Sequence, residues 1–334
     1  MRSSILLLAL TFTFISSSGN SQDSYFTDNN PEVVRYQVVT DVPYGEGKVL
    51  TDDTEQTIQL TMDVYHPQEK ADSPSPAIIL VYGGAHHRGN PRVKYTGFGS
   101  QTTSMSEYAM RFAEEGFVAF TIRYRVAPDN PVVSPYEGFA EADLETDFFK
   151  TPEAIRQANV IRDQMGLEAL TIDTAVPVLK TAVIAGAEDL RTAVKHVKSS
   201  YEMYNIDPDR IALMGFSAGA VTAINVAYGM QESVAAVIAN SGYPSVFNME
   251  RLLTAESNIP PLLVFMSQND YAVVQIELPP FLHHLTKIGA EYSFNWVPSH
   301  GHFYPSGVTS LGSDGSQMSL EARVIQFLRE KLDL

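Results

Sequence analysis

The sequence contains one serine whose neighbours suit a nucleophile. Residues 215–219 read Gly-Phe-Ser-Ala-Gly, with Ser217 at the centre. An apolar run at 211–214 precedes this motif and an Ala-rich stretch follows it, so Ser217 is predicted to lie between a strand and a helix. The flanking glycines give a tight turn the room that it needs, because a Cβ there would clash. The hydroxyl is therefore expected to project from the strand's carboxyl end, beside a helix N-terminus that favours developing negative charge.

The sequence also offers an acid and a base that could activate this serine. A serine hydroxyl is a weak nucleophile, so it needs a base within hydrogen-bond reach and a third group that orients the base. Asp270 follows an apolar run at 262–266, and His302 follows an alternating run at 292–297. Both side chains therefore leave the carboxyl ends of predicted strands, where open α/β sheets place their sites. Ser217, Asp270 and His302 also stand in the chain order expected for this type of serine.

Two of these assignments have competitors. Asp270 follows an asparagine, and an aspartate in such a place is commonly a turn residue, but its position in the chain order favours the acid. His300 competes with His302 for the role of base. Gly301 permits a close approach of the residue after it, which favours His302 and leaves His300 as a neighbour lining the pocket.

A loop of small residues could stabilise negative charge on a substrate oxygen. Residues 82–89 read Tyr-Gly-Gly-Ala-His-His-Arg-Gly and follow an apolar run at 77–82. Backbone N–H groups in such a loop are accessible to a ligand, and each preorganised donor contributes about 3 to 4 kcal/mol to acyl transfer. The amide of Ala218, directly after the serine, is a further donor, whereas a glycine turn that merely ends the strand is the alternative interpretation. Candidate pocket residues flank these groups: Tyr82, Gly83, His86, Phe216 and His300.

The adjacent histidines His86 and His87 do not predict a metal site. No third ligand stands at a recognisable spacing, and the acidic residues within 137–147 lack the spacing of a calcium-binding loop. We therefore expect neither a metal ion nor an organic cofactor.

Composition narrows the range of partners. The 334 residues include 23 Lys and Arg against 39 Asp and Glu, which gives a net charge of -16. Such a field repels phosphate backbones and anionic lipid headgroups, so nucleic acid is not an expected partner. The absence of cysteine from the sequence excludes a thiol nucleophile and disulfides. The oligomeric state is left open.

The N-terminus has the order of a secretory signal peptide. Arg2 is followed by an apolar run from Ile5 to Ile15 and then by small residues. An uncleaved membrane anchor is the alternative, but about 11 apolar residues fall short of the roughly 20 that a spanning helix needs. We therefore predict a signal peptide at 1–21, a secreted or periplasmic location, and a single domain over 22–334 without stable membrane insertion.

Strand and helix patterns alternate along this domain and indicate an α/β fold. The runs at 34–39 and 58–64 alternate apolar and polar residues and predict an antiparallel pair with one buried face. Continuous apolar runs predict strands buried on both faces at 77–82, 117–122, 211–214, 234–239 and 262–266. Apolar residues recur at the spacing of one helix face within 105–113, 190–204 and 320–328, and predict helices there. We therefore predict a doubly wound, mostly parallel sheet with an antiparallel N-terminal edge.

One segment interrupts this alternation. Residues 129–185 separate two core elements by far more than the usual connection of about 4 to 6 residues. Thr151 and Pro152 are a helix start, and Gly166 is a stop. We interpret this segment as a helical cap insertion over the site, while a structural excursion that never contacts substrate is the alternative.

Several stretches resemble the esterase/lipase and feruloyl-esterase-like α/β hydrolases, whose motifs are H-G-G-G and G-x-S-A-G. The matching stretches are VYGGAHHRG, FTIRYRVAP, NIDPDRIALMGFSAGA, PPLLVFMSQNDYAV and SHGHFY. Tyr82 stands where this group usually has His, and Ala85 stands for its third Gly. The resemblance implies the α/β-hydrolase fold, a triad and an oxyanion hole: Ser217, Asp270 and His302, with the amides of Gly84, Ala85 and Ala218.

The sequence thus predicts a serine carboxylic-ester hydrolase that forms an acyl-enzyme on Ser217. Its expected partner is a small-molecule or carbohydrate-linked ester, and the resemblance extends this to acyl or feruloyl groups of carbohydrates. A serine peptidase similar to prolyl oligopeptidases is one alternative, although the chain has no room for their propeller domain. A binding protein on a non-catalytic hydrolase fold is another, although it would lack members of the triad.

Overall fold

A long hairpin begins the part of the chain that the computed structural model describes, which is residues 35–69, 73–134 and 140–334. Strands β1 (Tyr36–Thr51) and β2 (Thr54–Pro67) pair antiparallel, with Asp52 and Asp53 in the left-handed region at the turn. This confirms the predicted antiparallel pair, although both strands are longer than predicted. Most of β1 is exposed, so apolar alternation marks only part of it. The predicted signal peptide, 1–21, lies outside the described residues.

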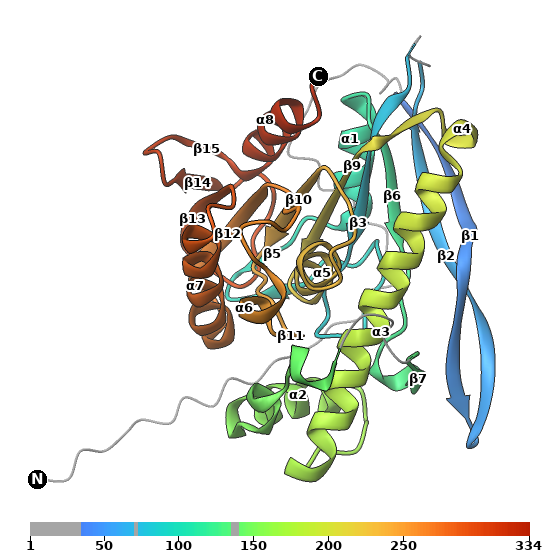
Figure 1. The fold of residues 1–334 in the computed structure, drawn as a ribbon, viewed down its shortest axis with the longest axis vertical. Coiled ribbons are helices and arrows are strands. Elements are labelled where there is room, and N and C mark those ends of the chain that lie inside the picture. Colours follow the sequence, from blue (N-terminus) through green and yellow to red (C-terminus); the bar gives the residue numbers. More distant parts are fainter. Residues whose placement is uncertain (1–34, 70–72, 135–139) are drawn as a thin grey trace, which may run out of the picture. The chain divides into compact units, whose positions relative to one another are not determined.

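The hairpin is part of a mixed sheet of 11 strands in the order β15-β14-β13-β12-β10-β9-β3-β6-β2-β1-β7 (Figure 1). Pairing is parallel from β13 across to β6 and antiparallel at both ends. The parallel strands are β3 (Ser75–Val81), β6 (Val118–Ile122), β9 (Ile206–Phe216), β10 (Ala236–Asn240), β12 (Leu262–Asn269) and β13 (Tyr292–Gly301). The predicted α/β fold, with its mostly parallel sheet and antiparallel N-terminal edge, is confirmed.

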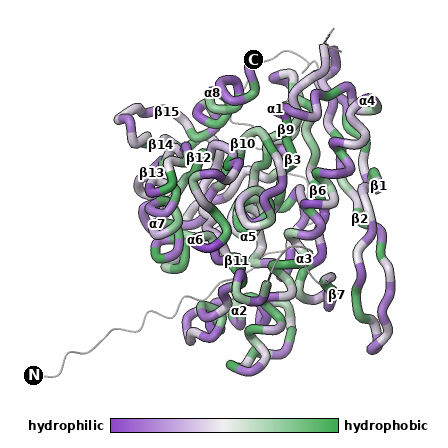
Figure 2. Tube along the Cα trace, in the orientation of Figure 1, coloured by the Kyte–Doolittle hydropathy of each residue, from purple (hydrophilic) through white to green (hydrophobic). Residues whose placement is uncertain are grey.

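The central strands are apolar because helices cover both faces of the sheet. Every residue of β3, β6 and β10 is buried, and Figure 2 shows the hydrophobic character concentrated on such strands. Helices α3 (Ile172–Ser199) and α5 (Ala218–Ile224) lie in front of the sheet in Figure 1, and α1 (Met105–Glu114) lies behind it. An ion pair between Arg111 and Glu321 ties α1 to α8 (Leu320–Lys331).

Three elements had no clear sequence pattern. Strands β14 (Thr309–Gly312) and β15 (Gln317–Ser319) are too short to show alternation, yet they make the second edge antiparallel. Helix α7 (Ala272–Lys287) contains Pro279 and Pro280, which normally argue against a helix. Short segments also join the sheet edge or its loops: β7 (Pro131–Val132), α4 (Tyr201–Tyr204) and α6 (Met249–Leu252).

The predicted insertion at 129–185 is partly helical, and helix α3 continues past its predicted end. Its described parts begin with η1 (Ala127–Asp129) and β7, and continue through η2 (Glu141–Asp143), β8 (Leu144–Glu145), η3 (Asp147–Lys150) and α2 (Pro152–Gln164). As predicted, the Thr151 side chain caps α2, and Gly166 follows it with φ of 69°. Helix α3 then runs through residue 185 without a break. The small residues there are buried in the helix, because α3 passes close to the loop after β3: a Cβ on Gly186 would lie 3.4 Å from His86.

Candidate active site

Ser217 occupies a strained turn between β9 and α5. Its φ of 53° and ψ of -121° are unusual for a residue with a side chain, and its N–H donates to the carbonyl of Asn240 at 2.9 Å. A Cβ on Gly215 would lie 2.2 Å from Gly219, and a Cβ on Gly219 would lie 2.0 Å from the Val81 carbonyl oxygen. Both glycines are therefore required for the turn that exposes the serine hydroxyl at the end of β9.

The structure brings Ser217, His302 and Asp270 into one line of contacts. His302 Nε2 lies 2.8 Å from Ser217 Oγ, and His302 Nδ1 lies 2.6 Å from Asp270 Oδ1. A carboxylate accepts hydrogen bonds, so the hydrogen of a neutral imidazole is on Nδ1 and the Nε2 lone pair faces the serine hydroxyl. His300 does not reach them, because its Nδ1 contacts the Pro298 carbonyl 2.9 Å away on β13. Of the two competing histidines, only His302 is in position to act on the serine.

Asp270 is held in its ionised form. Burial by itself raises the pKa of Asp270, but the facing His302 and several hydrogen bonds outweigh it and lower that pKa below its ordinary value. Oδ1 also accepts from the amide of Tyr271 at 2.9 Å, while Oδ2 accepts from the Ser241 hydroxyl at 2.6 Å and the Ser267 amide at 3.1 Å. The carboxylate thus keeps the charge that orients and stabilises a protonated imidazole.

The loop after β3 lies against the serine turn. A Cβ on Gly83 would lie 3.2 Å from Ser217 Cβ, and Tyr95 Oη fixes this part of the loop by donating to the Gly83 carbonyl at 2.8 Å. Gly84 and Ala85 have positive φ values of 111° and 57°, and a Cβ on Gly84 would overlap the Arg88 carbonyl.

Donors remain available in this loop and at the start of α5. Within the part of the chain that the structure describes, the amides of Gly84, Ala85 and Ala218 donate to no protein acceptor. Three such N–H groups next to a nucleophile suit an oxygen that becomes negative during reaction.

Two predicted pocket residues are buried and contact other parts of the interior. Tyr82 is 5% exposed, and its ring stacks on Tyr124 with centroids 4.5 Å apart. His86 is 6% exposed, and its Nε2 lies 3.0 Å from Thr222 Oγ1 on α5. Both were predicted as possible pocket residues, and in the structure both side chains are buried. Phe216, by contrast, lies beside His302 with ring centroids 5.2 Å apart.

Aromatic side chains that were not among the predicted site residues surround the His302 imidazole. Tyr271 stacks on the His302 ring with centroids 4.2 Å apart, and the Phe303 ring lies 5.2 Å away. Phe98 contacts both Tyr271 and Phe303, yet half of its surface is exposed. Tyr271 and Phe303 directly follow the predicted acid and base, so adjacency was a usable signal. Phe98 comes from a hairpin of β4 (Thr96–Gly97) and β5 (Ser100–Gln101) that no pattern marks.

The insertion contacts the same loops. Arg162 of α2 lies 3.4 Å from His87 Nε2, and Arg88 donates to Gln164 Oε1 at 3.0 Å. Strand β8 pairs antiparallel with β11 (Val246–Phe247), which belongs to the segment after β10. The C-terminal end of α2 therefore packs on the loop that carries the free amides.

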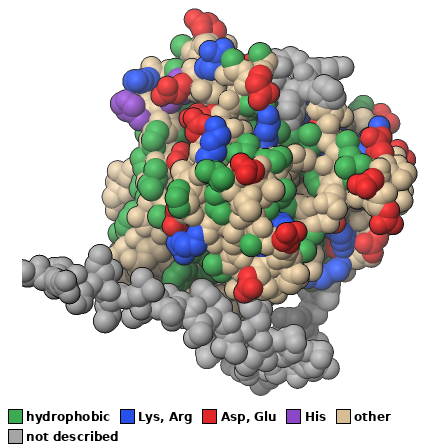
Figure 3. All heavy atoms as spheres, turned by 90° about the horizontal axis from the view of Figure 1, so that it is seen from below, with side chains coloured by type: hydrophobic (Ala, Val, Ile, Leu, Met, Phe, Trp, Pro, Cys, Tyr) green, Lys and Arg blue, Asp and Glu red, His purple; other side chains and the backbone are tan. Residues whose placement is uncertain are grey.

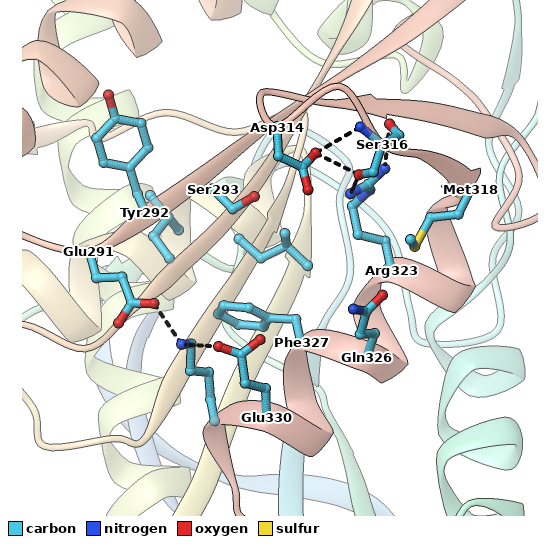
Figure 4. A pocket seen from close by; sticks show the side chains of 13 residues that line it. Glu291, Tyr292, Ser293, Asp314, Ser316, Met318, Arg323, Gln326, Phe327 and Glu330 are labelled. Carbon is cyan, nitrogen blue, oxygen red and sulfur yellow. Dashed lines mark hydrogen bonds and ion pairs between the residues drawn. The ribbon is translucent and has the colours of Figure 1, made fainter.

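A separate hollow of about 290 Å³ lies at the opposite end of the sheet (Figure 4). Its lining includes Leu262, the first residue of β12, whereas Asp270 follows the last. On its wall, Lys331 is paired with Glu291 and Glu330. This hollow is thus remote from the serine.

One face of the molecule carries charged side chains of both signs (Figure 3). Seen from below, acidic and basic side chains are interspersed with hydrophobic ones (Figure 3). In residues 35–69, 73–134 and 140–334, no three His, Cys, Asp or Glu side chains are grouped to hold a metal ion. Over the same described ranges, no helix has the length and apolar character needed to cross a bilayer.

Parts of the chain match known proteins in sequence. Residues 177–258 match the BD-FAE family, a range that includes Ser217 but ends before Asp270 and His302. A stretch of 67 residues, 20% of the chain, is 43% identical to chlorogenic acid esterase of Aspergillus niger, and the match spans only 13% of that enzyme's length.

Solved structures match over nearly the whole chain. The thermophilic esterase Est2 of the planctomycete Thermogutta terrifontis aligns with a TM-score of 0.52 and 15% identity, covering 90% of this chain and 92% of that one. A truncated carbohydrate esterase from gut microbiota aligns with a TM-score of 0.53 and 16% identity, covering 91% and 99%. The chain therefore has the α/β-hydrolase fold, and it resembles the esterase and feruloyl-esterase-like group.

Proposed function

We propose that this chain is a serine carboxylic-ester hydrolase with Ser217 as its nucleophile. The observation that carries the proposal is the unbroken set of contacts from Ser217 Oγ to His302 at 2.8 Å and from His302 to Asp270 at 2.6 Å. The His302 and Asp270 side chains are 2% and 0% exposed, so water does not compete for these bonds. Such an arrangement generates a nucleophile at neutral pH without a metal ion.

The reaction follows from the positions of the donors and acceptors. His302 Nε2 takes the proton of Ser217 as Oγ attacks the ester carbonyl carbon, and the carbonyl oxygen becomes negative near the amides of Gly84, Ala85 and Ala218. The imidazolium then gives its proton to the leaving alcohol as the C–O bond breaks. A water molecule, deprotonated by the same nitrogen, attacks the acyl-enzyme, releases the acid and restores the serine hydroxyl.

We further propose that the substrates are acyl or feruloyl esters of carbohydrates. Two observations support this: the likeness to chlorogenic acid esterase and to a carbohydrate esterase, and the aromatic rings of Phe98, Tyr271 and Phe303 near His302. Aromatic side chains bind flat, apolar groups through stacked or edge-on contacts. The predicted signal peptide at 1–21 implies export to the periplasm or the medium, where such polymers are accessible.

Hydrolysis of p-nitrophenyl acetate by the wild type, Ser217→Ala and Ser313→Ala tests the nucleophile. Ser313 is an exposed serine in the β14–β15 turn and serves as the matched control. We expect Ser217→Ala to lose at least about 10⁴-fold in kcat, and the control to match the wild type. A fluorophosphonate should label the wild type and the control but not Ser217→Ala. Equal turnover by wild type and Ser217→Ala, or an inert wild type, would overturn the proposal.

A panel of methyl ferulate, methyl butanoate and a p-nitroanilide peptide tests the substrate class. We expect the highest kcat/KM with methyl ferulate. Preference for the butanoate would refute the aromatic class while leaving the esterase intact, and cleavage of the anilide alone would favour a peptidase.

A further inference from the structure

The side of Asp270 that faces away from His302 is itself part of a buried hydrogen-bonded chain. Ser241, at the end of β10, contacts Asp270 Oδ2 at 2.6 Å through its hydroxyl, and the same hydroxyl lies 2.8 Å from Tyr304 Oη. Ser241 is 1% exposed and Tyr304 is 3% exposed. Neither residue contacts Ser217 or the amides of the oxyanion loop in any hydrogen bond of the described residues, so their hydrogen bonds reach the serine and the base only through Asp270.

The direction of each hydrogen bond in this chain is fixed by chemistry. An ionised carboxylate has no hydrogen to give, so the Ser241 hydroxyl donates to Asp270. That hydroxyl has a single hydrogen, so the contact with Tyr304 requires the tyrosine to be the donor. Burial, with a contribution from the charge of Asp270, raises the pKa of Tyr304 well above its ordinary value, which keeps its proton in place. The sequence of donors is therefore Tyr304 to Ser241 to Asp270.

The backbone at Ser241 is in a strained conformation. Its φ is 52°, a left-handed conformation that a residue with a Cβ adopts only when its surroundings impose it. The Ser241 amide donates to the Phe265 carbonyl at 2.9 Å, which ties the residue to β12, the strand that leads to Asp270. The strained backbone thus holds the hydroxyl against the carboxylate.

We propose that Ser241 and Tyr304 are positioning residues that tune the basicity of His302 by sharing the negative charge of Asp270. This proposal rests on the proposed function, since His302 must be the base that Asp270 supports. Each hydrogen bond donated to Oδ2 withdraws charge from the carboxylate and leaves less of it for the imidazole. The hydrogen-bonded series of Ser217, His302 and Asp270 is then extended by two more side chains, Ser241 and Tyr304.

Other groups that face the Asp270–His302 pair are few in the described residues. Tyr271 stacks on His302, and burial followed by the charge of Asp270 raises the pKa of Tyr271, so it is neutral. The charge of Arg88, in the loop after β3, reaches Tyr271, and Tyr108 of α1 faces Tyr304. Burial raises the pKa of Tyr108 as well. Tyr271, Tyr304 and Tyr108 keep their protons across the working pH range, so a shift in the pH profile of a Ser241 variant reports on the Asp270–His302 pair itself.

The test compares Ser241→Ala, Tyr304→Phe and the control Tyr228→Phe. Tyr228 is also fully buried and donates one hydrogen bond, to the Pro260 carbonyl at 2.9 Å, but it lies outside this chain. Ser241→Ala should move the acid limb of the kcat/KM profile upward by about 0.5 to 1 pH unit, because the carboxylate regains charge. Tyr304→Phe should move it in the same direction by less, and Tyr228→Phe should not move it.

A second readout separates this inference from the proposed function. The pH titration of the His302 imidazole, followed by ¹H–¹⁵N NMR and assigned with His302→Gln, does not require turnover. If the wild type proves inert on esters, an upward shift of this titration in Tyr304→Phe and Ser241→Ala still supports the inference. If the variants lose activity while neither the acid limb nor the imidazole titration moves, the inference is wrong and their role is structural. Tyr304→Phe, which removes one hydroxyl, carries the test should Ser241→Ala fail to fold.

Discussion

The buried side chain of His86 predicts a specific loss of stability in acid. Its Nε2 lies 3.0 Å from Thr222 Oγ1, and the Thr222 hydroxyl donates to the Ala218 carbonyl at 2.8 Å. Thr222 therefore accepts from His86, which must carry its hydrogen on Nε2. Burial, helped by the neighbouring His87, lowers the pKa of His86 from 6.5 to about 3. A protonated His86 is thus poorly tolerated in the folded protein.

The sign and size of the effect follow from this depressed pKa. Between about pH 6.5 and pH 3 the unfolded chain binds a proton at His86 that the folded protein excludes, so stability falls as pH falls through this window. At about pH 5, which is roughly 1.5 units below the unfolded pKa, the loss is about 2 kcal/mol at about 1.4 kcal/mol per unit. At about pH 7.5 the loss is close to zero, because both states are neutral there.

The assay is guanidinium unfolding of the wild type and His86→Gln at the two pH values. Glutamine retains an N–H donor for Thr222 but does not titrate, so the variant should lose about 2 kcal/mol less than the wild type between about pH 7.5 and pH 5. His283→Gln, at an exposed position on α7, is the matched control and should follow the wild type. If His86→Gln lost as much stability as the wild type, the argument from burial would be refuted.

Three further substitutions test other parts of the structure. Asp270→Asn should lower kcat on p-nitrophenyl acetate by about 10⁴-fold, because an amide does not hold the imidazole in its active tautomer. An unchanged kcat would show that Asp270 takes no part in the reaction. Gly219→Ala places a Cβ 2.0 Å from the Val81 carbonyl oxygen and should reduce the free energy of unfolding by about 3 kcal/mol or more; an unchanged denaturation midpoint would contradict this. Arg125→Met leaves the buried Asp189 without the guanidinium that donates to it, and should reduce the free energy of unfolding by about 3 to 5 kcal/mol. The double variant Arg125→Met/Asp189→Leu should recover most of this free energy, because it removes the unpaired carboxylate as well.

The positions of the serine, acid and base could be predicted because each follows a strand. Strands buried on both faces need continuous apolar runs, and such runs precede Ser217 and Asp270 in the sequence. Parallel neighbours then place their carboxyl ends along one edge of the sheet, so the chain order of the three residues is enough to bring them near each other. Their contacts at 2.6 and 2.8 Å depend on the loops, which the sequence pattern does not determine.

The supporting residues could not be predicted, because they depend on which strands are neighbours. Ser241 reaches Asp270 only because β10 lies next to β12, and nothing in the sequence around Ser241 marks it. Pairing of this kind joins residues far apart in the chain. Helix α3 runs across the predicted end of the insertion for a related reason: Gly186 has close contacts with Tyr124 and His86, and its lack of a side chain lets the helix pass close to the loop after β3.

Gly301 has a second role beside the one on which the prediction of His302 as the base rests. We predicted His302 as the base because a glycine before it allows a close approach to the serine. In the structure a Cβ on Gly301 would lie 2.7 Å from the Phe98 ring, and a Cβ on Gly97 would lie 2.5 Å from the Phe303 ring. The two glycines therefore let the β4–β5 hairpin pack against the segment that carries the base. Gly301 thus leaves room for the Phe98 ring, which comes from a distant loop. The glycine used to predict His302 as the base therefore also allows the aromatic side chains beside His302 to pack together.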